Sequence, residues 1–570
     1  MFQQTLDPVG GSLALSALCA AIPLVTLFVL LGALKVKAWL AGVISLVVAL
    51  AVAIVLFEMP VDQALLAGTE GAAFGFFPIL WIVINAIWVY NLTVASGHFD
   101  VLRRSFERVS PDQRIQAIII AFCFGALLEA LAGFGTPVAI TVVMLLALGF
   151  EPIKAAAVAL IANTAPVAFG ALATPIVTLS TVTSGVSDDP RLDVDTLGAM
   201  VGRQTPILAI VVPLILVIVV DGKRGARQTW LPALTAGVAF GLAQFIAANY
   251  ISVPLADIVA ALVSAAAVVL LLRVWSPAET MHAPEPEKAP DGGSAPTGVG
   301  AGGEDAEQED GTRTGGVVAK RDAGNEVAKA YAPYLVIIAI FSLANLPAVK
   351  EFLLEKPFTY EFGWPGLEIL NSAGEPVLAT TFIFNWLPAA GTLMIFAGII
   401  TALILKISPA RMVKEYAGTY YELRSAILTV MAVLALAYVM NLSGQTTSLG
   451  AWLAGTGAAF AIISPILGWL GVAVTGSDTS ANALFGALQV QTATQAGLDP
   501  VLMAAANSSG GVMGKMVSPQ NLAIAAAAVG MAGREGDIFR KVLGWSLVLL
   551  LLMCVIVGLQ STPVLGWMVP

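Results

Sequence analysis

The sequence has 570 residues, of which 58% are hydrophobic and only 11% are charged, against roughly 25% in soluble domains. Its mean hydropathy of +0.88 indicates a protein whose surface faces a lipid bilayer. The formal net charge is −9, and the basic residues form no patch of the kind that binds nucleic acid. A role in nucleic-acid binding is therefore excluded.

Long apolar runs predict helices that cross the membrane. A helix needs about 20 apolar residues to cross about 30 Å of hydrocarbon, and it satisfies its own backbone groups there. The first run exceeds the core of a signal peptide and is expected to be retained. We expect an all-α integral membrane protein with about 12–14 transmembrane helices. In chain order, the runs are 13–34, 39–57, 115–128, 207–220, 258–272, 393–405, 426–440 and 542–559.

The loops between these runs alternate in charge, which predicts the topology. Short loops rich in Lys and Arg mark the cytoplasmic side. Strict alternation places the N-terminus outside, in a multi-pass protein of the cell membrane. Residues 276–329, rich in Pro, Gly and acidic residues, predict a disordered cytoplasmic linker. The basic loops are 35–37, 103–114, 223–227, 313–329, 406–414 and 534–541, and the others are 58–62, 188–195, 249–254, 350–375 and 443–448.

Two internal matches indicate that the chain is a repeat. NTAPVAFGALATP at 163–175 aligns without gaps with NSSGGVMGKMVSP at 507–519, an offset of 344 residues (507 − 163). GFGTP at 133–137 aligns with GSDTS at 476–480, an offset of 343 (476 − 133). Shifting the loops by this offset reverses their charge, so the two halves are expected to have inverted topology. Inverted repeats are typical of secondary transporters with a binding site near the bilayer midplane.

The repeat predicts four regions. The first inverted repeat covers 1–220, and connecting transmembrane helices cover 221–275. The linker covers 276–329, and the second inverted repeat covers 330–570. Chance similarity remains an alternative, because the matched segments are short.

Four stretches inside the apolar regions combine Gly or Pro with polar residues: 129–137, 163–175, 475–482 and 507–519. Gly and Pro interrupt helices, and an interrupted or re-entrant helix exposes backbone groups within the membrane. Helix N-termini and side-chain hydroxyls or amides can bind a small anion there. We expect substrate contacts from Gly133, Gly135, Thr136, Asn163, Thr164, Thr479, Ser480, Asn482, Asn507, Ser508 and Ser509.

Three ionisable residues lie in these stretches, and a charge in the bilayer is a functional candidate because it is costly. Burial favours the neutral form of a carboxyl, as a proton carrier requires, so Glu129 and Asp478 are the candidate proton sites. Lys515 is the candidate countercharge for an anionic substrate. The alternatives are a fixed salt bridge between Asp478 and Lys515, and a hydrated helix end for Glu129. For the Gly, Ser and Thr residues the alternative is close helix packing.

Three segments resemble the signature segments of the L-lactate permease family: LLEALAGFGTPV at 127–138, GSDTSANALFG at 476–486 and NSSGGVMGKMVSPQN at 507–521. The resemblance implies uptake of L-lactate, D-lactate and glycolate by proton symport. It also implies kinship with a wider ion-transporter superfamily, in which 115–182 and 472–530 would be the moving elements. The linker at 276–329 is longer and more acidic than the resemblance leads us to expect.

The sequence thus predicts a transporter and not an enzyme, with a small monocarboxylate and protons as its partners. It contains neither a His/Cys metal cluster nor a Ser-His-Asp set, so no cofactor or metal is expected. Another organic anion, or coupling to Na⁺, remains the alternative. The oligomeric state is left open.

Overall fold

The computed structural model describes residues 1–133, 135–187, 189–281 and 323–570. Ten helical segments in these ranges are long and apolar enough to cross a membrane, or eleven if one bent pair counts as a span. Two shorter apolar helices, Thr136–Ala147 and Ala390–Ile404, bring the number into the expected range of 12–14. The all-α membrane fold is confirmed.

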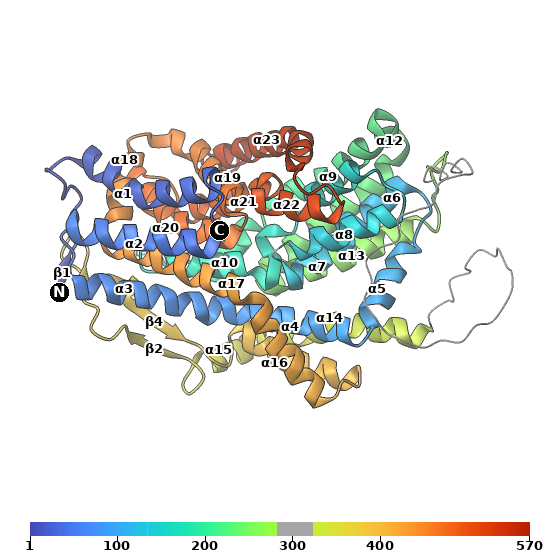
Figure 1. Ribbon diagram of the computed structural model, residues 1–570, viewed down its shortest axis with the longest axis horizontal. Helices are drawn as coiled ribbons and strands as arrows, with labels where there is room; N and C mark the ends of the chain where they lie inside the picture. Colours follow the sequence, from blue (N-terminus) through green and yellow to red (C-terminus); the bar gives the residue numbers. More distant parts are fainter. Residues whose placement is uncertain (134, 188, 282–322) are drawn as a thin grey trace.

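The first helices form a layer along one side of the molecule (Figure 1). Pro60 precedes α3, and a π-helical segment joins α3 to α4, so that Val61–Ala95 is a single helical run. The elements are β1 (Phe2–Gln3), α1 (Leu13–Phe28), η1 (Val29–Ala33), α2 (Ala38–Val55), α3 (Val61–Phe74), η2 (Gly75–Leu80), α4 (Trp81–Ala95) and α5 (His98–Glu107).

The first predicted polar region is a buried, broken helix pair. The run 113–132 is wholly buried and ends at a break before α8. Gly135 occupies the break at a φ of +87°, a left-handed conformation that favours glycine. The elements are α6 (Gln113–Gln116), η3 (Ala117–Phe124), α7 (Gly125–Ala132), α8 (Thr136–Ala147), α9 (Pro152–Ala162), η4 (Val167–Phe169), α10 (Gly170–Thr183) and α11 (Val194–Val201).

A helical hairpin connects the halves. The long α12 is interrupted at Asp221 and Gly222 and packs against α13. Residues 282–322 of the predicted linker lie outside the described residues, and α14 already begins at Gly324, so the predicted linker extends too far. The elements are α12 (Thr205–Ile246), η5 (Ala247–Ile251), η6 (Val253–Leu255), α13 (Ala256–Leu271), α14 (Gly324–Ala344) and α15 (Pro347–Leu354).

Four short strands gather at the end of the molecule that holds the N-terminus, here called the strand end (Figure 1). β1 pairs in parallel with β3, and β2 pairs antiparallel with β4. The opposite end, with α5 and α6, is called the linker end. The elements are β2 (Tyr360–Gly363), β3 (Ile369–Leu370), η7 (Leu378–Thr380), β4 (Thr381–Phe384), α16 (Ala390–Ile404), α17 (Pro409–Leu442) and α18 (Gln445–Ala454).

The second predicted polar region also contains a break between helices. Gly476 ends α19 at a φ of +76°, and Ser477 caps α20 by accepting a hydrogen bond from the backbone N–H of Ser480. The elements are η8 (Gly457–Ala459), α19 (Phe460–Thr475), α20 (Asp478–Ala496), α21 (Pro500–Gly514), η9 (Lys515–Val517), α22 (Pro519–Ala528), α23 (Glu535–Gln560) and η10 (Gly566–Met568).

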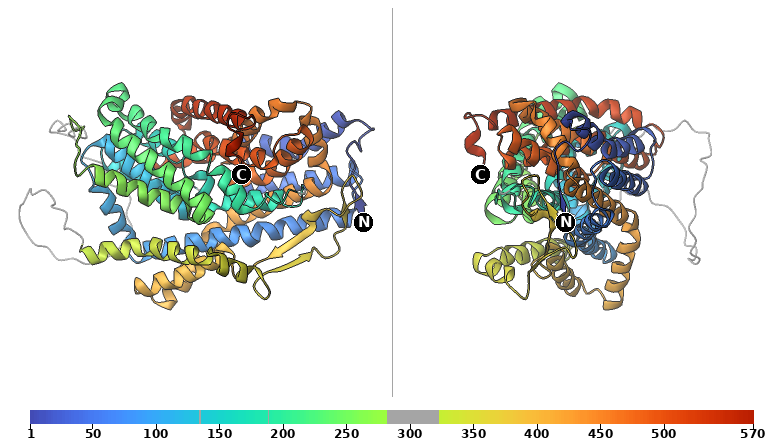
Figure 2. Two further views of the ribbon diagram at one scale, coloured as in Figure 1. Left: turned by 180° about the vertical axis from the view of Figure 1, so that it is seen from behind. Right: turned by 90° about the vertical axis from the view of Figure 1, so that its left-hand side faces the viewer.

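Two large hydrophobic cores divide the helices into two bodies. One core draws mainly on α5–α14, α16 and the helices of the second polar region, α19–α23, and it includes one face of α4. The other draws mainly on α1–α4 and α17, with α17 packed along α2 and α3. The two bodies lie against each other along the length of the molecule (Figure 2). Most of both predicted polar regions therefore packs in the first core, whereas the first half of α20 packs in the second.

Candidate functional site

A cavity of about 620 Å³ lies where the two bodies meet. Helices α2, α4 and α17 of one body line one side, and the breaks of the two polar regions line the other. Lys37 and Glu422 are exposed and lie on its rim. The polar and charged lining comprises Lys37, Tyr90, Asn91, Glu129, Thr136, Thr174, Glu422, Ser425, Thr429, Thr475, Ser477, Asp478, Thr479, Ser480, Lys515 and Gln520.

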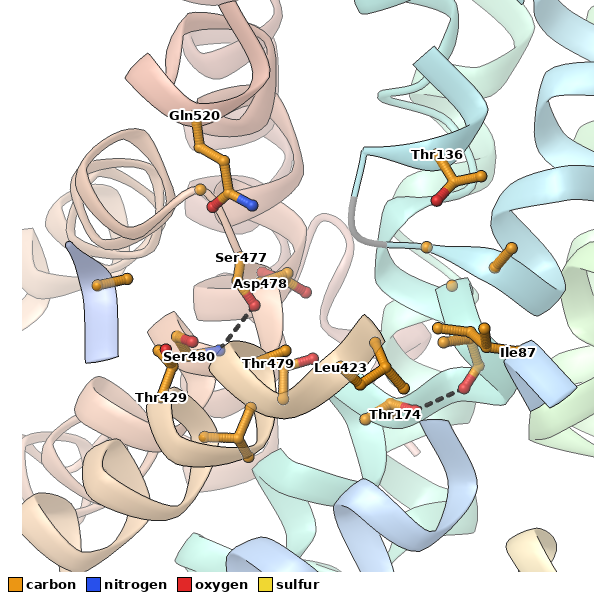
Figure 3. A pocket seen from close by; sticks show the side chains of 18 of the residues that line it. Ile87, Thr136, Thr174, Leu423, Thr429, Ser477, Asp478, Thr479, Ser480 and Gln520 are labelled. Atoms are coloured by element: carbon orange, nitrogen blue, oxygen red, sulfur yellow. Dashed lines mark hydrogen bonds between the residues drawn. The ribbon is translucent and has the colours of Figure 1, made fainter. Parts of the chain in front are cut away.

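Helix N-termini from both halves of the chain border this cavity. Thr136 begins α8, and Asp478 begins α20 on the opposite side (Figure 3). Gln520, in the first turn of α22, lies on the same side as Asp478. The first turns of helices have free N–H groups and a partial positive charge, so these ends favour an anion.

Glu129 and Lys515 form an ion pair across the two halves. Lys515 Nζ lies 2.6 Å from Glu129 Oε1, and the exposed fractions of the two side chains are 8% and 3%. Asn163 Nδ2 donates to the other carboxylate oxygen, Glu129 Oε2, at 2.9 Å. Both carboxylate oxygens of Glu129 therefore have a hydrogen-bond donor. The predicted alternative of a salt bridge paired Lys515 with Asp478, whereas the structure pairs it with Glu129.

Asp478 lies nearby without a cationic partner in the described residues. Ser508 Oγ donates to Asp478 Oδ2 at 2.6 Å, and Asp478 Oδ1 has no partner among the described residues. Gly511 leaves the space that Asp478 Oδ1 occupies, because a Cβ at position 511 would overlap this oxygen. This buried carboxyl therefore has one hydroxyl donor and one unfilled hydrogen-bonding position among the described residues.

The structure brings half of the predicted site residues to the cavity wall. Seven of the fourteen line the cavity: Glu129, Gly133, Thr136, Asp478, Thr479, Ser480 and Lys515. The others, which lie behind the wall, are Gly135, Asn163, Thr164, Asn482, Asn507, Ser508 and Ser509. Among these, Asn163 and Ser508 each donate a hydrogen bond to a carboxyl of the site.

The two asparagines matched by the repeat have different partners. Asn163 contacts the carboxylate of Glu129, whereas Asn507 Nδ2 donates to Asn482 Oδ1 at 2.9 Å and Asn507 Oδ1 accepts from Gln489 at 3.0 Å. Asn482 in turn donates to the backbone oxygen of Pro175 at 3.0 Å, which ties α20 to α10. These amides hold the helices that form the cavity.

Sequence reasoning missed several polar residues of the site. Tyr90 and Asn91 lie on α4, outside the four polar stretches, whereas Thr174 lies within the stretch 163–175 but was not among the expected substrate contacts. It also missed two fully buried carboxyls, Glu70 on α3 and Asp257 on α13. Both are single acidic residues beside or within apolar segments, and that signal could have identified them.

The described residues contain no group of three or more His, Cys, Asp or Glu side chains arranged to hold a metal ion. The cavity instead offers one buried ammonium group, several hydroxyls and helix N-termini. This donor set suits an oxygen anion of small size.

Comparison with known proteins gives the family. Residues 16–564 match the L-lactate permease family. The chain is 41% identical to an L-lactate permease of Bacillus subtilis (100% of this chain and 99% of the relative) and 42% identical to the glycolate permease GlcA of Escherichia coli (99% and 98%). The solved structure of the Alcanivorax borkumensis YdaH transporter matches at a TM-score of 0.42 and 15% identity, covering 86% of each chain. That likeness is too distant to position individual residues. The protein belongs to the L-lactate permease family.

Proposed function

We propose that this protein imports L-lactate, D-lactate and glycolate together with protons across the cytoplasmic membrane. The Glu129–Lys515 pair on the cavity wall is the observation that supports this proposal most strongly. The printed names of two relatives, an L-lactate permease and a glycolate permease, support the choice of substrates.

The substrate carboxylate binds Lys515 and the N-terminus of α20. Thr479 and Ser480 begin that helix and line the cavity, and Thr136 faces them across it. The hydroxyl of lactate or glycolate needs a hydrogen-bonding partner once water is excluded, and these threonine and serine side chains offer one. Lys515 is the one buried lysine among the described lining residues, which matches a single substrate carboxylate.

Proton coupling follows from competition for Lys515. The substrate carboxylate displaces Glu129 from the ammonium group, and an unpaired buried Glu129 carboxylate would cost several kcal/mol. Glu129 therefore takes up a proton when the substrate binds. The empty site contains one positive and one negative charge, and so does the loaded site, where the substrate anion replaces ionised Glu129. The empty site and the loaded site are therefore both neutral overall. The conformational change of the transport cycle then moves no net charge of the site in either case, so its electrostatic cost is similar.

The cavity opens toward the cytoplasm in this conformation. Its rim includes Lys37, from a loop whose positive charge predicts the cytoplasmic side. The corresponding breaks at Gly133 and Gly476 support inverted repeats, and the two hydrophobic cores support motion of one body against the other. In the resulting topology the N-terminus is outside and the described flanks of 276–329 are cytoplasmic.

Uptake of radiolabelled lactate into proteoliposomes tests this function. An imposed inward proton gradient should drive accumulation, whereas an inward Na⁺ gradient at equal pH should not. Unlabelled glycolate should compete, and a dicarboxylate should compete poorly. Accumulation driven by Na⁺ alone, or preference for a dicarboxylate, would replace the proposal with its nearest alternative.

A further inference from the structure

Asp257 is a buried carboxyl behind the site that the mechanism above does not use. It lies in the first turn of α13, and its side chain has no exposed surface. Gln244 Nε2 donates to Asp257 Oδ1 at 2.9 Å, while Asp257 Oδ2 has no partner among the described residues. One neutral amide is therefore the only hydrogen-bond partner of this buried carboxyl among the described residues.

A short polar connection links Asp257 to Glu129. Gln244 Nε2 also donates to the backbone oxygen of Ala165 at 3.3 Å. Ala165 is in the same turn as Asn163, whose side chain donates to Glu129. Two further acceptors of this turn, Asn163 Oδ1 and Thr164 Oγ1, are buried and have no partner among the described residues. The segment between the two carboxyls therefore contains two unfilled hydrogen-bond acceptors.

The charged groups that act on Asp257 are those of the site itself. Glu129 on α7 and Lys515 on η9 both interact with it electrostatically. Cys123 on η3 contacts Ser264, two turns further along α13. Helix α10 and η6 contain no ionisable residue. The ionisable residues of α12 lie near the middle of the helix, away from Gln244 at its end: Asp221, Lys223, Arg224 and Arg227. Those of α14 lie in its first half: Glu326, Lys329, Tyr331 and Tyr334. The other end of α14 meets the segment before α13, where Asn345 donates to Ser252.

We propose that Asp257 is the proton donor that supplies Glu129 when the substrate displaces Glu129 from Lys515. This inference rests on the proposed proton symport. In the step, the O–H bond at Asp257 breaks, the proton passes along the turn that contains Asn163 and Thr164, and an O–H bond forms at Glu129. A hydronium ion from the side of proton entry then reprotonates Asp257 and leaves as water, so the charges balance and no redox partner is involved.

The test compares net uptake with exchange in proteoliposomes. Asp257→Asn preserves shape and neutrality but cannot release a proton. Exchange of internal for external labelled lactate can proceed with the proton held on Glu129. We therefore expect near-wild-type exchange, while net uptake driven by a pH gradient slows by at least about tenfold, the lower range for loss of a positioned proton donor. Glu70→Gln, which changes another fully buried carboxyl, is the matched control and should leave both rates unchanged.

Each other outcome rejects part of the proposal. If wild-type uptake ignores the pH gradient, the proposed symport fails, and the role of Asp257 fails with it. If the wild type responds and Asp257→Asn takes up lactate at the wild-type rate, or loses uptake and exchange together, Asp257 is structural. Should Asp257→Asn not fold, infrared spectra of a Glu70→Gln/Asp478→Asn protein decide. A protonated-carboxyl band must persist in that protein at neutral pH, and its absence overturns the proposal.

Discussion

Replacing Lys515 by methionine separates the structural from the functional role of its ion pair. The pair is short, at 2.6 Å, and almost fully buried. Removing one partner of a buried pair costs about 3–5 kcal/mol, because the other charge is left uncompensated. In Lys515→Met, Glu129 keeps only its hydrogen bond from Asn163. We therefore expect the single variant to be less stable than the wild type at neutral pH, by less than this full cost because an unpaired Glu129 takes up a proton.

The double variant Lys515→Met/Glu129→Gln has no uncompensated charge at this position. Its stability should return to within about 1 kcal/mol of the wild type, since neutral replacements of buried pairs are often tolerated. Its lactate uptake should nevertheless be absent, because both the anion site and the proton acceptor are gone. Unfolding in detergent and uptake in proteoliposomes measure the two effects. Full stability of Lys515→Met alone, or pH-driven uptake by the double variant, would refute the reasoning.

Two further predictions concern Asp478 and the strand end. Gly511→Ala should reduce uptake at least about tenfold, because its Cβ would overlap Asp478 Oδ1, whereas Gly544→Ala, with open space around it, should have little effect on uptake. Arg191 Nη2 lies 2.6 Å from Asp189 Oδ2, and its hydrogen bonds lower the pKa of that carboxyl. This stabilisation is present above the unfolded pKa of about 3.9 and is lost as the pH falls through the lowered native pKa. Arg191→Gln should therefore cost about 1 kcal/mol at pH 7, with a difference from the wild type that shrinks in acid; a difference independent of pH would contradict this.

The pattern of apolar runs and polar breaks was sufficient to predict the membrane fold, and several residues of the polar breaks line one cavity. Glu129, Asp478 and Lys515 all line one cavity, as their position in helix-breaking segments indicated. Composition and spacing are informative here because polar and charged groups are costly inside the bilayer. Those that occur in apolar segments are therefore candidates for a function. The three signature segments likewise agree with the family match over residues 16–564.

The partners within the site could not be predicted from the sequence. Lys515 and Glu129 are 386 residues apart, and which carboxyl meets the lysine depends on how α7 and η9 are placed in the fold. The repeat aligns Asn163 with Asn507, yet one contacts a carboxylate and the other contacts amides. Side-chain direction on packed helices is a tertiary property, so a repeat in sequence does not fix it.

The most direct test is a structure of the protein with bound L-lactate. We predict that the lactate carboxylate lies within hydrogen-bonding distance of Lys515 Nζ, and that Glu129 has moved away from the ammonium group. A structure in which lactate binds elsewhere while the Glu129–Lys515 pair stays intact would contradict coupling by competition for Lys515.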